Sequence, residues 1–77
     1  MNDMIPQRKL FAAILRQGIH DALSIDKPHW WDAIHWIRET DPSWEGSFEN
    51  VCNLLNIDAP TIRRKVFESV ARMLTDN

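Results

Sequence analysis

The chain of 77 residues lacks tyrosine, has a single cysteine and contains no long apolar run. A membrane-spanning helix needs about 20 apolar residues, and no segment approaches that length. The first residues, MNDMIPQRKL, include an early acid and no apolar core, which argues against a secretory signal peptide. Because Cys52 has no partner for an internal disulfide, it fits a reducing compartment. These absences predict a cytoplasmic protein with no membrane partner.

Catalytic and metal-binding patterns are missing as well. There is no nucleophile elbow and no phosphate-binding loop. No two of the three histidines, His20, His29 and His35, are three or four residues apart, so the spacing typical of a zinc site is absent. We therefore expect no enzymatic activity, no metal or other cofactor, and no small-molecule substrate.

Basic residues are not in excess either. Nine Lys and Arg face eleven Asp and Glu, which gives a formal net charge of -2. This balance argues against a general polyanion binder, although it leaves room for a local basic patch. With 44% hydrophobic and 26% charged residues, the composition is that of a globular protein, and the length allows one small core. We expect a single domain over residues 1–77.

Four segments with a helical apolar period make up the chain. The first runs from about residue 7 to 23, with Gly18 on its apolar stripe, where it permits a close helix crossing. The second opens at DKPHWW with Pro28 in its first turn, and its expected inward residues are Trp30, Ala33, Ile34 and Ile37. Trp31 and Trp36 fall on either side of that stripe, so at least one of them should be partly exposed. The predicted fold is all-α, a compact four-helix domain.

The loop TDPSWEG should follow, with Gly46 free to take a positive φ and Trp44 over the edge of the core. The third helix should begin at the N-cap Ser47 and bury its apolar residues: Phe48, Val51, Cys52, Leu54 and Leu55. Asn56 tolerates the left-handed conformation that ends many helices. The fourth helix should be capped by Asp58, carry Pro60 in its first turn and reach about Leu74, with Leu74 on its buried stripe.

The last two helices resemble the helix-turn-helix superfamily over about residues 47–75. The residues that carry this resemblance are Cys52 at the helix crossing, Asn56 at the turn, and Ile57 and Ile62 closing the corner, supported by Val51 and Leu55. A tighter pattern, WI followed by SFENVC-x-LL-x-ID and IR, is similar to a small family of bacterial and prophage proteins with a C-terminal helix-turn-helix-like unit. The resemblance implies a bacterial or phage setting.

Two functions follow as hypotheses. The first, slightly favoured by the helical corner, is a DNA-binding transcriptional regulator, aided by a homodimer on two half-sites, with contacts from Thr61, Arg63, Arg64 and Lys65. The alternative for the basic residues is a solvated face on which Arg64 or Lys65 pairs with Glu68. The second function, favoured by the acidity, is a protein-interaction module. Its anchors on the acidic, Trp-rich surface of residues 26–49 would be Trp31, Trp36 and Trp44.

Overall fold

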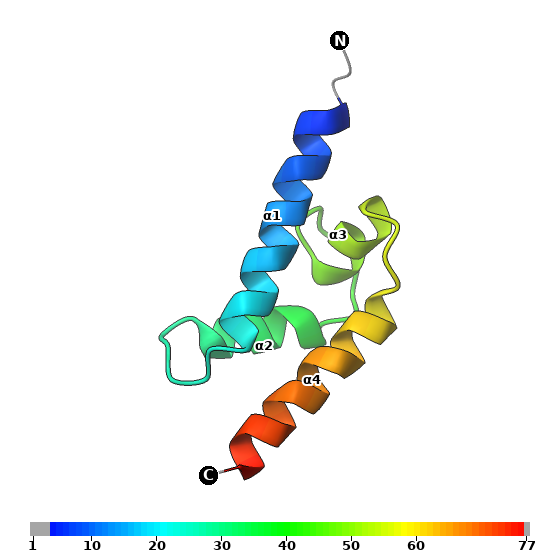
Figure 1. The fold of residues 1–77 in the computed structure, drawn as a ribbon. Helices are drawn as coiled ribbons and strands as arrows, with labels where there is room; N and C mark the ends of the chain where they lie inside the picture. Colours follow the sequence, from blue (N-terminus) through cyan, green and yellow to red (C-terminus); the bar gives the residue numbers. More distant parts are fainter. Residues whose placement is uncertain (1–3, 77) are drawn as a thin grey trace.

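Within residues 4–76, four α-helices form the fold: α1 (Met4–Ala22), α2 (Trp30–Arg38), α3 (Phe48–Leu54) and α4 (Ala59–Thr75). The computed structural model describes the backbone of residues 4–76 and the side chains of residues 7–76, and no strand occurs within that range. The all-α prediction is therefore confirmed. The long helix α1 packs against all three others (Figure 1). The first turns of α1 extend past α3, and the last turns of α4 extend past α2.

The core is centred on the short helix α3. Phe48, Val51 and Cys52 are fully buried there, and they cluster with Ile37 of α2 and Ala22 of α1, which are fully buried as well. Burying side chains of this size contributes about 1.5–3 kcal/mol each relative to exposure. A helix of seven residues cannot be stable by itself. The packing of α3 between α1 and α4 therefore maintains its helical conformation.

Local signals fix the ends of α3 and the start of α4 as predicted. Ser47 Oγ accepts a hydrogen bond from the Asn50 N–H at 3.1 Å, and the Asp58 carboxylate accepts one from the Thr61 N–H at 3.2 Å. Asn56 has φ 59°, and the Ile57 N–H donates to the Cys52 carbonyl at 2.9 Å. Together with the bond from the Asn56 N–H to the Asn53 carbonyl, this is a Schellman motif that turns the chain directly into α4.

Burial determines the ionisation of the thiol of Cys52, the only cysteine in the sequence. Desolvation, helped by the nearby negative charge of Glu49, raises the pKa of the Cys52 thiol to about 11. The thiol is therefore protonated at neutral pH and unreactive as a nucleophile. Since the folded state retains this proton above the pKa of the unfolded thiol, the contribution of Cys52 to stability is present below about pH 9 and is lost as the pH rises toward 11.

Other predictions about these elements are wrong. α2 begins at Trp30, because Pro28 lies in a preceding turn in which the Trp30 N–H donates to the Lys27 carbonyl. Gly46 does not take a positive φ. Leu54 and Leu74 are 51% and 52% exposed. Phe48, Val51 and Cys52 occupy the buried face of the short helix α3, so Leu54 lies outside that face. Leu74 is in the last turn of α4, and the last turns of α4 extend past α2.

Gly18 permits the close crossing of α1 and α2, as its position on the apolar stripe predicts. A Cβ atom at this position would overlap the six-membered ring of Trp36. That ring cannot move away easily, because Trp36 Nε1 donates to the Gly46 carbonyl at 2.8 Å and the indole packs edge-on against Phe48 at 5.4 Å between centroids. The close contact between α1 and α2 therefore requires glycine, which has no side chain, at position 18.

We expect Gly18→Ala to lower the free energy of unfolding by about 1–3 kcal/mol through overpacking, although alanine raises helix propensity by about 1 kcal/mol. Urea unfolding measures the change. In a Trp36→Leu background, which removes the ring, the same substitution should cost nothing or stabilise the protein. An equal loss in both backgrounds would show that the ring does not limit this position.

Candidate interaction surfaces

The side chain of Arg63 turns toward the interior of the protein. Its Nε donates to the Ile37 carbonyl at 2.7 Å, and its Nη2 donates to the Glu39 carbonyl at 3.3 Å and forms an ion pair with Glu49. Its guanidinium carbon also lies over the Phe48 ring, 5.1 Å from the centroid. The carbonyls belong to the C-terminal end of α2, where helical acceptors lack partners within the helix. Arg63 therefore links α4 to α2 and α3, and its charge is used within the chain.

The other three residues predicted to contact DNA differ in whether their side chains bond to other groups of the chain. Thr61 is half-buried, and its hydroxyl donates to the Asp58 carboxylate, which also caps α4. Arg64 and Lys65 are exposed. Neither forms an ion pair with Glu68 or with any other carboxylate among the side chains that the structure describes. Of the four residues predicted to contact DNA, these two present free cations at the surface.

The tryptophans separate into two groups. Trp36 is half-buried, and its contacts with Gly18, Gly46 and Phe48 give it a role in packing. Trp31 and Trp44 are each 59% exposed, so the expectation that Trp31 or Trp36 is exposed is confirmed for Trp31. Trp44 does not cover the core edge as predicted, because its ring folds back on Gly46 within its own loop.

Trp31 stands on a helix rather than in a loop. Its ring lies 4.8 Å from the His35 ring, edge-on, and 5.6 Å from the Trp30 ring, with both distances between centroids. The indole Nε1 of Trp30 is buried and has no hydrogen-bond acceptor among the described residues. An unpaired buried donor costs about 1–3 kcal/mol. The Trp30 indole, which packs beside Trp31, therefore has an unsatisfied N–H donor.

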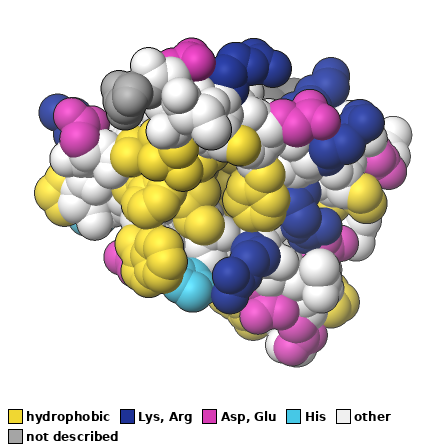
Figure 2. Space-filling view, turned by 90° about the horizontal axis from the view of Figure 1, so that it is seen from below, with side chains coloured by type: hydrophobic (Ala, Val, Ile, Leu, Met, Phe, Trp, Pro, Cys, Tyr) yellow, Lys and Arg dark blue, Asp and Glu magenta, His cyan; other side chains and the backbone are white. Residues whose placement is uncertain are grey.

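Apolar side chains gather on the end of the molecule where α2 and the last turns of α4 lie. Figure 2 looks at this end and shows a broad hydrophobic area there. We call it the apolar end surface. Apart from Trp36, whose ring lies against Gly18 of α1, the large apolar residues of α2 and of the C-terminal half of α4 that are half-buried or exposed are Trp30, Trp31, Ile34, Phe67, Met73 and Leu74, and we assign the surface to them. Contiguous apolar areas on a protein surface commonly mark contact sites.

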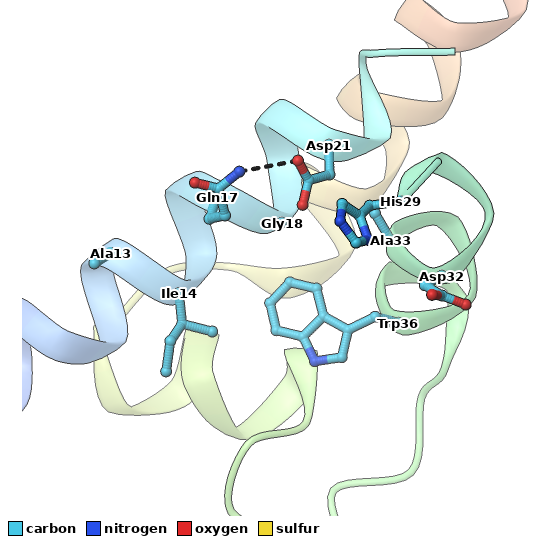
Figure 3. A pocket seen from close by; sticks show the side chains of 9 residues that line it. All are labelled: Ala13, Ile14, Gln17, Gly18, Asp21, His29, Asp32, Ala33 and Trp36. Atoms are coloured by element: carbon cyan, nitrogen blue, oxygen red, sulfur yellow. Dashed lines mark hydrogen bonds between the residues drawn. The ribbon is translucent and has the colours of Figure 1, made fainter. Parts of the chain in front are cut away.

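A hollow of about 530 Å³ lies between α1 and α2 (Figure 3). The Trp36 ring points into it, and its charged residues are Asp21 and Asp32. Gln17 Nε2 donates to Asp21 Oδ1 at 2.9 Å, an i, i+4 bond that orients this carboxylate along α1. No sequence pattern predicted this hollow. Its only signal is the pair of small residues, Ala13 and Gly18, on the side of α1 that faces α2.

No three His, Cys, Asp or Glu side chains of residues 7–76 come together in a way that could hold a metal ion. Among the helices described, none is long and apolar enough to cross a bilayer. The chain matches no protein-family model, no curated protein and no solved structure. The surfaces themselves are therefore the basis for a functional proposal.

Proposed function

We propose that this chain is a protein-interaction module that binds a partner through the apolar end surface, with Trp31 as the anchor. The observation that carries the proposal is the 59% exposure of Trp31 on the helix α2, beside Trp30 and His35. Tryptophan is enriched among the residues that dominate the energy of protein interfaces. Because Trp31 is already held by its neighbours, binding would cost little side-chain entropy.

The acidic segment that contains α2 indicates what the partner offers. Residues 23–58 contain seven acidic residues and only two basic ones, Lys27 and Arg38. Asp26 and Asp32 flank the tryptophans of α2 in the sequence, and both are exposed. A partner with an apolar pocket and a basic rim would complement this surface. A bacterial or phage accessory factor fits such a role, in line with the resemblance of the sequence.

DNA binding is the second candidate, and a specific feature favours it. The Schellman motif at Asn56 joins α3 to α4 in a tight corner, as in a helix-turn-helix unit, and Arg64 and Lys65 are exposed on α4. Base reading at the start of α4 is poor, because Asp58 and Thr61 bond to each other. DNA contacts would thus go mainly to phosphates, and a homodimer would be needed for appreciable affinity.

We expect Trp31→Ala to abolish partner binding with little effect on folding. A photo-crosslinking amino acid placed at position 35, next to the intact Trp31, in cells that produce the chain naturally, should yield one dominant protein adduct. The matched control is position 44, whose tryptophan is as exposed as Trp31 but lies outside the apolar end surface. Unlabelled wild-type chain should compete for the adduct, and the Trp31→Ala chain should not. Adducts of the same identity and yield at both positions would contradict the proposal.

The DNA candidate makes a separate prediction. Binding to mixed-sequence duplex DNA should weaken steeply with salt, and the double substitution Arg64→Ala with Lys65→Ala should reduce both the affinity and the salt slope. Fluorescence anisotropy across a salt series measures both quantities. A wild-type chain without salt-dependent DNA binding would exclude this candidate.

A further inference from the structure

A second apolar depression lies on the other side of α1, where α1 faces α4 and the turn before it. Two hollows, of about 550 and 240 Å³, adjoin here because both are lined by Ile19 and Ile62. We call the continuous depression the α1–α4 groove. Its apolar lining includes Leu15, Ile19, Leu55, Ile57, Ile62 and Val66, with Leu23 at one end.

The groove is long enough to hold a helix. Its α1 side runs from Arg8 to Leu23, the residue just past α1, which corresponds to about 22 Å, or four helical turns, at 1.5 Å per residue. Ile19, Leu55 and Ile62 along it are only half-buried, and Leu23 at one end is 37% exposed. Partner helices that lie in such grooves insert apolar residues at i, i+4 and i+7, and that spacing spans two turns.

Every ionic side chain that lines the groove is basic. Arg8 and Arg16 line it from α1 and Lys65 from α4, and no Asp or Glu of the described residues lines it. The same bias extends to the whole of the two long helices. Helices α1 and α4 contain seven of the nine basic residues and only two acidic ones, an excess of five positive charges, although the chain as a whole is acidic.

We propose that the α1–α4 groove binds an acidic amphipathic helix of a partner protein. The apolar floor takes the apolar face of that helix, and Arg8, Arg16 and Lys65 face its flanking carboxylates. Duplex DNA fits less well, because a floor of Leu, Ile and Val offers phosphates and base edges no hydrogen bonds. The groove shares no lining residue with the apolar end surface and does not depend on the proposal made for Trp31.

A second copy of this chain does not supply the required helix. Each of the four helices contains a single acidic residue: Asp21 in α1, Asp32 in α2, Glu49 in α3 and Glu68 in α4. Glu49 is moreover used by Arg63. None of these helices can place carboxylates on both sides of an apolar stripe. The charge pattern of the groove therefore points to a different protein.

A displayed peptide library tests the proposal while the natural partner is still unidentified. The library contains helical peptides of about four turns. Three inward positions are varied among Leu, Ile and Ala, and the flanking positions among Glu, Lys and Gln. Selection on the full-length wild-type chain should enrich peptides with Glu at the flanking positions and large apolar residues at i, i+4 and i+7. Enrichment of Lys-rich or unpatterned peptides, or no enrichment, would overturn the proposal.

Charge reversal locates the binding site of the best peptide. We expect Arg16→Glu with Lys65→Glu to weaken binding roughly tenfold at low salt, with a smaller ratio at high salt. The matched control is Lys27→Glu with Arg38→Glu. These two exposed residues do not line the groove, and their substitution changes the net charge by the same amount. The control should change the Kd less than about twofold. Trp31→Ala should leave the Kd unchanged, so a failure at this site is distinguishable from a failure of the proposed function.

Three results would overturn the assignment. Equal losses in the two charge-reversed variants would show a general charge effect. Displacement of the peptide by mixed-sequence duplex DNA would assign the groove to nucleic acid. A concentration-dependent dimer of the wild type that Arg16→Glu with Lys65→Glu dissolves would assign it to a second copy. Circular dichroism of both variants, which change exposed residues only, should match the wild type.

Discussion

One guanidinium group links α4 to the end of α2. Arg63 bonds to two carbonyls at the C-terminal end of α2, pairs with Glu49 in the first turn of α3 and covers the ring of Phe48. A planar guanidinium has five donors in a fixed geometry, so one side chain satisfies acceptors on two different helices at once. No other ion pair joins the described helices, and α4 has few other contacts with α2. Arg63 therefore joins α4 to α2 through polar contacts, where few other contacts between the two helices exist.

This use of Arg63 determines which surfaces are free for function. The three basic residues at positions 63–65 are contiguous in the sequence, but they point in different directions. Arg63 faces α2 and α3, Lys65 lines the α1–α4 groove, and Arg64 is exposed. A single basic patch does not form. Asp26 and Asp32 lie near Trp31 in the sequence, whereas the ionic residues that line the groove are basic. On this basis we propose different occupants for the two surfaces.

Much of the fold was predictable, because its signals are local. Ser47, Asp58 and Asn56 act on backbone groups within a few residues, so their roles can be inferred from the sequence alone. The exposure of Leu54 and Leu74 was not predictable, because it depends on which helix lies opposite each residue. The partners of Arg63 are 14 to 26 residues away in the sequence, and no local pattern identifies them. The charge bias of α1 and α4, by contrast, can be counted from the sequence once the helices are assigned.

The most direct test of the structural role of Arg63 is the stability of Arg63→Ala compared with that of its neighbour, Arg64→Ala, by urea unfolding. Removing Arg63 leaves the partly buried Glu49 without its cation and two carbonyls without donors, so we predict a loss of about 1.5–3 kcal/mol. Arg64 is exposed and forms no ion pair with the described residues, so its replacement should change stability by less than about 0.5 kcal/mol. Equal and small effects of the two substitutions would contradict this role, because Arg63 would then be as free for external contacts as Arg64.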